Sequence, residues 1–133
     1  CLALAIYFEA RSEPVVGQVA VGQVVLNRAA DHRYPNSVCG VVKQGPTYKW
    51  TQDFPVRHKC QFSWYCDGKS DIPKDPKSFT LAVHLSAILL AGEIADPTEG
   101  ATHYHASYVL PAWASSKTKT VRINDHIFYR WER

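Results

Sequence analysis

Apolar positions dominate the first part of the chain and predict two consecutive helices. Seven apolar residues run without a break from Leu2 to Phe8 and predict a helix over residues 2–10. A second helix is predicted over residues 15–30, where apolar side chains would point in nearly every direction. A helix that is apolar on all sides is typically buried, so we expect this one to lie in the core.

Two further helices are predicted in the middle of the chain. A turn-rich segment ending in Ser37 introduces a short helix over residues 38–44. Asp75 and Pro76 introduce a longer helix over residues 77–91, which Gly92 ends. This helix offers two candidate core stripes, Phe79, Val83, Ala87 and Leu90 on one and Leu81, Leu85 and Ile88 on the other.

The last third of the chain changes to the pattern of short strands. Residues 100–106 alternate like a strand, and residues 121–130 predict a strand, a turn at Asn124 and Asp125, and a second strand. Between the helices, residues 45–76 are rich in Pro, Gly, Asp and aromatic residues, which is typical of a functional or disulfide-tied loop. Helices followed by a small antiparallel sheet predict one mainly helical α+β domain over residues 1–133.

Charge and composition narrow the classes of partner. The net charge is +3 and the sequence pI is about 8.7, with Lys and Arg scattered, which falls short of a nucleic-acid-binding pattern. No apolar run reaches the roughly 18 residues of a membrane span. A slight positive balance suits an anionic polymer such as a bacterial wall. The chain begins inside a helix pattern without Met, so we expect an upstream segment to have been removed.

Four cysteines form an even set, which indicates an oxidising compartment and hence an extracytoplasmic location: periplasm, cell envelope or secreted. Cys1, Cys39, Cys60 and Cys66 permit three pairings, and the sequence does not choose between them. A pair of Cys60 with Cys66 would close a tight loop and leave Cys1 for Cys39. The alternative is four buried thiols in a cytosolic protein.

Glu9 is the candidate general acid. It follows the apolar run on the last turn of the predicted helix, where apolar surroundings and the helix's own terminal carbonyls disfavour a negative charge. Both effects raise the pKa of a carboxyl, and general-acid catalysis needs a carboxyl that keeps its proton near neutral pH. The alternative is that Glu9 simply pairs with Arg11 or Arg28. Glu13 is expected to cap the helix over residues 15–30.

Several runs of residues, spread over the whole chain in one order, carry a resemblance. They are Ile6 to Arg28 with Glu9 and Glu13, Tyr34 to Gln44, Gln61-Phe62-Ser63, Ala101 to His105, Trp113, and Ile123 to Tyr129. This set resembles the SleB/CwlJ cell-wall hydrolase family. Two features depart from the family: Asn124 stands where Gly is usual, and the cysteines are absent from the spore-forming relatives, which suggests that this chain is not a spore-cortex enzyme.

The resemblance implies a lysozyme-like fold and cleavage of the β-1,4 bond between N-acetylmuramic acid and N-acetylglucosamine in peptidoglycan glycan strands. Glu9 aligns with the family's single catalytic Glu. Ordinary glycosidases need two carboxylates, whereas the resemblance implies a lytic transglycosylase that forms 1,6-anhydromuramyl ends with one. No cofactor, metal, nucleic acid or membrane span is implied, and we expect a monomer. The alternatives are a hydrolytic muramidase and a non-catalytic peptidoglycan-binding module.

Polar and aromatic residues of the quoted motifs are expected to bind the sugar, because flat rings suit sugar faces and amide or hydroxyl groups suit their polar substituents. These candidate substrate-binding residues are Gln61, Phe62, Ser63, Trp64, Tyr104 and His105. A metal interpretation also exists: His103 and His105 would point the same way from a strand, as in a zinc-dependent wall amidase. No further metal-binding motif accompanies them, so a structural or substrate-lining role is favoured.

Overall fold

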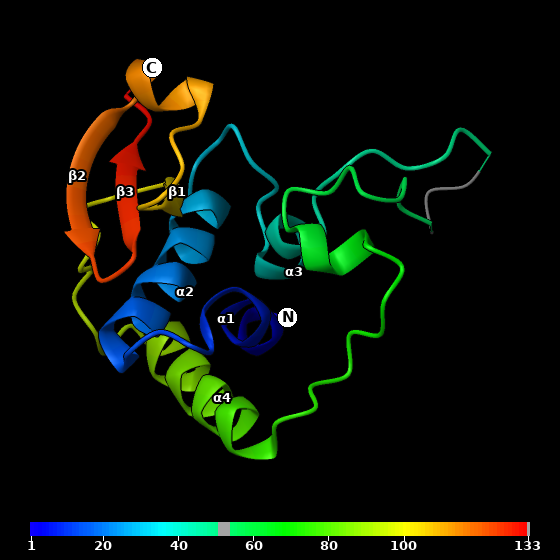
Figure 1. The fold of residues 1–133 in the computed structure, drawn as a ribbon, viewed down its shortest axis with the longest axis horizontal. Helices are drawn as coiled ribbons and strands as arrows, with labels where there is room; N and C mark the ends of the chain where they lie inside the picture. Colours follow the sequence, from blue (N-terminus) through cyan, green and yellow to red (C-terminus); the bar gives the residue numbers. More distant parts are fainter. Residues whose placement is uncertain (51–53, 133) are drawn as a thin grey trace.

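The computed structural model describes residues 1–50 and 54–132. Three residues of the irregular segment 45–76, residues 51–53, therefore lie outside the described part. The elements follow in the order α1 (Leu2–Ala10), α2 (Val15–Ala29), α3 (Val38–Val42), the 3-10 helix η1 (Ser63–Cys66), α4 (Pro76–Leu90), β1 (His103–Ala106), the 3-10 helix η2 (Ala112–Ser116), β2 (Thr118–Ile123) and β3 (His126–Arg130). The expected helices-first α+β order is confirmed (Figure 1).

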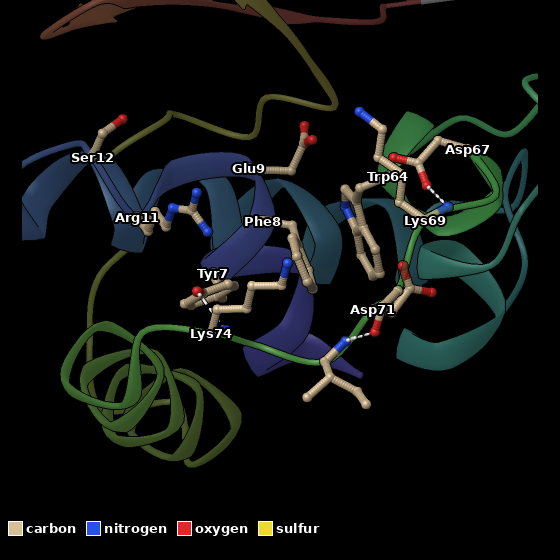
Figure 2. A pocket seen from close by; sticks show the side chains of 12 residues that line it. Tyr7, Phe8, Glu9, Arg11, Ser12, Trp64, Asp67, Lys69, Asp71 and Lys74 are labelled. Atoms are coloured by element: carbon tan, nitrogen blue, oxygen red, sulfur yellow. Dashed lines mark hydrogen bonds between the residues drawn. The ribbon is translucent and has the colours of Figure 1, made fainter.

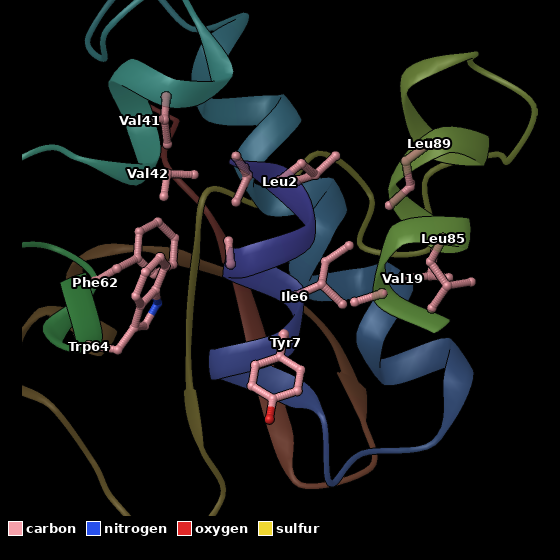
Figure 3. Packing of buried hydrophobic residues seen from close by; sticks show 13 residues of the cluster. Leu2, Ile6, Tyr7, Val19, Val41, Val42, Phe62, Trp64, Leu85 and Leu89 are labelled. Carbon is pink, nitrogen blue, oxygen red and sulfur yellow. The ribbon is translucent and has the colours of Figure 1, made fainter. Parts of the chain in front are cut away.

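Helix α1 is the centre of the helical part, and α2, α3 and α4 all pack against it (Figure 1). Its residues Leu2, Ala5, Ile6 and Tyr7 are buried and belong to the main core cluster, to which the other helices add side chains such as Val19, Val41 and Leu85 (Figure 3). A short helix can be this apolar because it is enclosed on several sides. A polar side chain near the C-terminal end of α1, such as that of Glu9, therefore lies inside the domain.

Helix α2 forms where the pattern predicts it, with one correction to its expected burial. Val15 and Val16 are about half exposed, because the first turn of the helix extends beyond its neighbours. Glu13 also does not cap this helix, since Pro14 occupies the N-cap position without a side-chain hydrogen bond. The Glu13 carboxylate instead lies 3.3 Å from Nδ1 of His126.

Helix α4 begins as expected, because the Asp75 carboxylate accepts a hydrogen bond from the backbone N–H of Ser78. Each predicted core stripe is only partly buried, however: in the second, Leu85 is buried and Leu81 packs against the core, but Ile88 is 37% exposed. Val83 is 44% exposed and Leu90 is 59% exposed. The face that packs against the rest of the domain carries Ala82, Leu85, Ser86 and Leu89. A helix with many apolar residues offers several faces, and the neighbouring helices select the one that is buried.

The three strands form an antiparallel sheet in the order β1-β3-β2, which confirms the predicted strand-turn-strand over residues 121–130. The turn depends on Asn124, whose φ of 52° is left-handed, a conformation that Gly and Asn tolerate best. The sheet packs on α2 through a second cluster of buried residues, Ala20, Val24, Ala101 and Phe128. The predicted strand over residues 100–106 is shorter, starting at His103.

Two disulfides tie the helical part, Cys1–Cys39 and Cys60–Cys66. The first joins the residue before α1 to α3, and the second closes the loop around η1. With all four cysteines paired, the oxidised state fits the expected oxidising compartment. Among the described residues, no helix is long and apolar enough to cross a membrane.

The disulfides are expected to differ in their contribution to stability. A cross-link restricts the unfolded chain more when the loop it closes is longer, and the separations are 38 residues for Cys1–Cys39 and 6 for Cys60–Cys66. Replacing Cys1 and Cys39 together by Ser should lower the free energy of unfolding by about 4 kcal/mol, against about 2 kcal/mol for Cys60 and Cys66. Urea unfolding followed by circular dichroism measures both, and an equal loss in the two variants would contradict the expectation.

Candidate active site

Glu9 lies on the last turn of α1 and lines two adjacent cavities. The smaller has a volume of about 200 Å³ and is also lined by Arg28, Gln61, Phe62, His103, Tyr104 and Trp113. The larger has a volume of about 600 Å³ and extends from α1 to the segment after η1. The Glu9 carboxyl therefore stands where the two cavities meet, with room for a ligand on both sides.

The hydroxyl of Tyr104, on β1, donates a hydrogen bond to Oε1 of Glu9. Burial raises the pKa of Tyr104 well above its ordinary value, and the neighbouring Glu9 charge raises it further, so the phenol keeps its proton and remains a donor. The ring is fixed in turn by Phe128 and by His126, whose ring centroids lie 5.6 Å and 5.1 Å away. The sheet thus holds a donor against the carboxyl of the helix.

Burial raises the pKa of the Glu9 carboxyl above its ordinary value of 4.5. The hydrogen bond from Tyr104 and the positive charge of Arg28 both act in the opposite direction, and burial is the largest of the three effects. A carboxyl with a raised pKa in an open cavity can donate a proton to a ligand and then remain as a base. These properties are those of a general acid.

Arg28 is buried near Glu9 but does not neutralise it. The Arg28 Nε donates a 2.7 Å hydrogen bond to the carbonyl of Thr102, and its guanidinium lies over the rings of Tyr34 and Phe62. No Lys, Arg or His nitrogen among the described residues lies within 4.0 Å of the Glu9 carboxylate. The alternative that Glu9 is held in an ion pair with Arg11 or Arg28 is therefore wrong.

His103 contributes a neutral ring to the smaller cavity. Burial, with the positive charges of Arg28, Lys117 and Arg33, lowers the pKa of His103 to about 4. The ring packs against Trp113, with centroids 5.0 Å apart. At neutral pH it can accept or donate a hydrogen bond without adding charge.

Aromatic rings form one side of the larger cavity (Figure 2). The rings of Phe8 and Trp64 are stacked, with centroids 4.9 Å apart and planes at 21°. Phe8 immediately precedes Glu9 on α1, and Trp64 comes from η1. This arrangement gives the carboxyl a flat apolar neighbour, as a sugar-binding site requires.

The structure brings most of the predicted substrate-binding residues to the two cavities. Gln61, Phe62 and Tyr104 line the smaller cavity and Trp64 lines the larger. Ser63 begins η1 and is exposed, but it lines neither cavity.

The expectation that His105 binds substrate does not fit its position. The His105 ring is buried: its Nε2 is 2.9 Å from the hydroxyl of Tyr129, and its Nδ1 is 2.8 Å from the carbonyl oxygen of Ala106. Both ring nitrogens are engaged inside the protein. The ring packs instead against Trp113 and Tyr129, whose ring centroids lie 5.7 Å and 5.3 Å away.

Sequence reasoning missed the charged residues that line the larger cavity, Arg11, Asp67, Lys69, Asp71 and Lys74. Four of them lie in the irregular segment 45–76, where no periodicity indicates which side chains face inward. Three carboxyls therefore line this cavity when Glu9 is included. Burial and the neighbouring Asp67 charge raise the pKa of Asp71.

A metal centre is not supported by the described residues. Residues 1–50 and 54–132 contain no group of three His, Cys, Asp or Glu side chains placed to hold an ion. Cys60 and Cys66 are joined in a disulfide, which removes them as partners for the histidines of β1.

The fold and the site together define an α+β enzyme domain with a buried carboxyl of raised pKa, Glu9, in an aromatic-lined cleft. A family model described as Cell Wall Hydrolase matches residues 12–129, and the chain belongs to this family. The match begins three residues after Glu9, so the assignment of the acid rests on the geometry above.

Several known proteins are similar to this chain. The spore cortex-lytic enzymes of Halalkalibacterium halodurans and Bacillus subtilis are each 34% identical over 128 residues, 96% of this chain. Those matches cover 33% and 35% of the relatives, so the chain spans about a third of their length. The catalytic domain of the germination-specific lytic transglycosylase SleB from Bacillus anthracis has a TM-score of 0.68 and 27% identity, covering 97% of this chain and 90% of that one. The SleB catalytic domain of Bacillus cereus has a TM-score of 0.65 and 26% identity, covering 97% of this chain and 86% of that one.

Replacing Tyr104 by Phe is expected to raise the pKa of Glu9 further. The hydroxyl of Tyr104 stabilises the ionised carboxyl, and its removal leaves burial less opposed. Titration of the Glu9 side-chain carboxyl by NMR measures the change directly. Tyr108→Phe is the matched control, because Tyr108 is 85% exposed. An unchanged or lower Glu9 pKa in Tyr104→Phe would contradict the described hydrogen bond.

Replacing Glu9 by Gln is expected to stabilise the fold at neutral pH. The folded-state pKa is raised, so ionisation destabilises the folded state as pH rises from the unfolded pKa through the folded pKa. Below the unfolded pKa both states are protonated and the effect vanishes. We expect a gain of about 1 kcal/mol at pH 7 and none at about pH 3. Urea unfolding at the two pH values tests this, and a variant that is less stable at neutral pH would refute it.

Proposed function

We propose that this domain cleaves the β-1,4 bond between N-acetylmuramic acid and N-acetylglucosamine in peptidoglycan, and that it does so as a lytic transglycosylase. The observation that carries the proposal is the Glu9 carboxyl, which has a raised pKa and stands at the junction of two cavities. Family membership supports the polymer, and the similar domain from Bacillus anthracis, a lytic transglycosylase, supports the reaction.

In the proposed first step, the protonated Glu9 donates its proton to the glycosidic oxygen as the bond to C1 of the muramic acid breaks. The positive charge that develops at C1 is stabilised by the N-acetyl group of the same sugar. Because the Tyr104 hydroxyl occupies Oε1 of Glu9, the other carboxyl oxygen is the one available for proton transfer. The same hydroxyl then stabilises the carboxylate that remains.

In the second step, the Glu9 carboxylate takes the proton of the C6 hydroxyl, whose oxygen bonds to C1. The product is a 1,6-anhydromuramyl end, Glu9 is protonated again, and no water is consumed. One carboxyl therefore performs both proton transfers, as acid and then as base. Burial raises the pKa of Glu9 and the Tyr104 hydrogen bond opposes that rise, which suits a carboxyl that first donates a proton and then accepts one.

The sugars are positioned by the residues that line the two cavities. We propose that the exposed Gln61 amide contacts the sugar on one side of the cleaved bond, and that Trp64 stacked on Phe8 contacts the sugar on the other. The Phe62 ring, 2% exposed, belongs to the core beneath this site. All of these residues belong to one chain, so the proposed site needs a single copy of the protein. The two disulfides support an extracytoplasmic location, where the wall lies.

A hydrolytic muramidase is the second candidate, because one observation favours it. Asp67 and Asp71 line the same cavity as Glu9, and two carboxyls are what hydrolysis requires. Figure 2 shows both on the far side of the Phe8 and Trp64 rings from Glu9. This placement favours transglycosylation, in which neither Asp takes part in the chemistry.

Glu9→Gln is expected to reduce the release of soluble fragments from purified sacculi by about 10³-fold while binding to sacculi is retained. Glu93→Gln, at an exposed position, is the matched control and should release fragments at the wild-type rate. Mass spectrometry of the wild-type products is expected to show 1,6-anhydromuramyl ends.

Other products would decide against the proposal. If the wild type gives reducing ends, and Asp67→Asn or Asp71→Asn no longer produces them, the enzyme is a hydrolase. Free stem peptides, lost after treatment with a strong chelator, would establish the zinc-dependent amidase. Binding to sacculi with no released fragments would establish a non-catalytic peptidoglycan-binding module.

A further inference from the structure

The larger cavity carries more charge than the cleavage of a neutral glycosidic bond requires. Besides Glu9 and the aromatic rings, it is lined by three cationic side chains, Arg11, Lys69 and Lys74. Arg11 follows α1 directly, and the two lysines belong to the segment between η1 and α4 (Figure 2). These residues converge on one space of about 600 Å³ from parts of the chain about 60 residues apart.

The three cations are available to a ligand. No Asp or Glu oxygen of residues 1–50 and 54–132 lies within 4.0 Å of their side-chain nitrogens. The Arg11 guanidinium lies 5.0 Å from the centroid of the Tyr7 ring instead. Unpaired cations around a cavity attract carboxylate ligands, and Arg and Lys bind carboxylates through charge-assisted hydrogen bonds.

The segment that carries the lysines is anchored to α1. The buried Tyr7 hydroxyl accepts hydrogen bonds from the backbone N–H groups of Lys74 and Asp75, at 3.1 Å and 3.0 Å. The Asp67 carboxylate accepts one from the backbone N–H of Lys69, at 2.8 Å. The backbone of Lys74 is thereby held against α1, and that of Lys69 is held within its own turn. These hydrogen bonds order the segment that forms this wall of the cavity.

The cavity also carries negative charge, from Asp67 and Asp71. A ligand that fits this lining carries carboxylates together with a cationic group. The lactyl side chain of muramic acid alone offers a single carboxylate, whereas a peptide stem offers several carboxylates and, where it is not cross-linked, a free amine. The mixed lining therefore favours the stem over the bare lactyl group.

The position of Glu9 places such a stem at this cavity. In the proposed reaction, the muramic acid whose bond is cleaved lies against Glu9, and its stem leaves the sugar at C3, a short distance from the cleaved bond. Two cavities that Glu9 borders are then within reach of the stem. The smaller cavity has a volume of about 200 Å³ and is lined by Arg28, His103 and Trp113. The larger has three times the volume and the unpaired charges.

We propose that the larger cavity binds the peptide stem of the muramic acid, with Arg11, Lys69 and Lys74 binding its carboxylates and Asp67 and Asp71 binding its amine. This inference rests on the proposed function. It makes the domain selective for glycan strands that still carry their peptides. The determinants of that selectivity lie outside the acid and the sugar-contacting rings.

The test compares kcat/KM on two soluble substrates, uncross-linked glycan strands with intact stems and the same strands after an amidase has removed them. The wild type is expected to prefer the peptide-bearing strands by about tenfold or more. The double variant Lys69→Gln/Lys74→Gln should lower that ratio by roughly tenfold. The matched control is Lys43→Gln/Lys119→Gln. It removes two exposed lysines, one just after α3 and one on β2, and should leave the ratio unchanged.

The outcomes separate the inference from the proposed function. Equal wild-type cleavage of both substrates would overturn the stem site and leave the transglycosylase proposal standing. Equal loss on both substrates in Lys69→Gln/Lys74→Gln would also overturn it, because the cations would then bind the glycan or its lactyl carboxylate. No cleavage of either substrate by the wild type would instead refute the proposed function. Circular dichroism of each variant confirms that the fold is retained.

Discussion

The hydrogen bond from Tyr104 to Glu9 joins the two parts of the molecule. Glu9 belongs to α1, around which the other helices pack, and Tyr104 belongs to the small sheet. The sheet reaches this position because Phe128, the register partner of Tyr104, packs into the cluster shared with α2. The helices bury the Glu9 carboxyl, but the hydrogen-bond donor that stabilises its ionised form, Tyr104, comes from the sheet. The active site therefore depends on how the sheet docks on the helices.

That docking is secured by a second polar contact at the far end of the sheet. The Glu13 carboxylate meets Nδ1 of His126 and accepts a hydrogen bond from the backbone N–H of Asp125, so the turn between β2 and β3 is held against the start of α2. His126 also packs edge-on against the ring of Tyr104. Glu13 thus supports the site through two neighbours without lining either cavity. A substitution there would act on the position of Tyr104 rather than on the chemistry.

The cleft combines two kinds of surface for physical reasons that differ. Rings and an amide around Glu9 offer contacts that suit an uncharged sugar, and the burial of the Glu9 carboxyl raises its pKa. In the charged wall formed by residues 67–74, the side chains of Lys69 and Lys74 are exposed to water. A site with both can bind a polymer whose backbone is neutral and whose branches are charged. Both surfaces lie within this chain, which spans about a third of the length of its relatives.

The sequence alone determined the helices, the terminal hairpin and the helices-first order, because each depends on local pattern: an unbroken apolar run, an Asp before a Pro, an Asn-Asp pair between strands. It also singled out Glu9 as the candidate acid, because one carboxyl ends the apolar run. Tertiary structure decided which face of α4 is buried, which histidine of β1 meets the cavity, and that Glu13 pairs with His126 instead of capping α2. It also selected the disulfide partners from three possibilities and gathered Arg11, Lys69 and Lys74 around one space. Those outcomes depend on contacts between residues far apart in the chain, and no local pattern encodes which distant surface a side chain will meet.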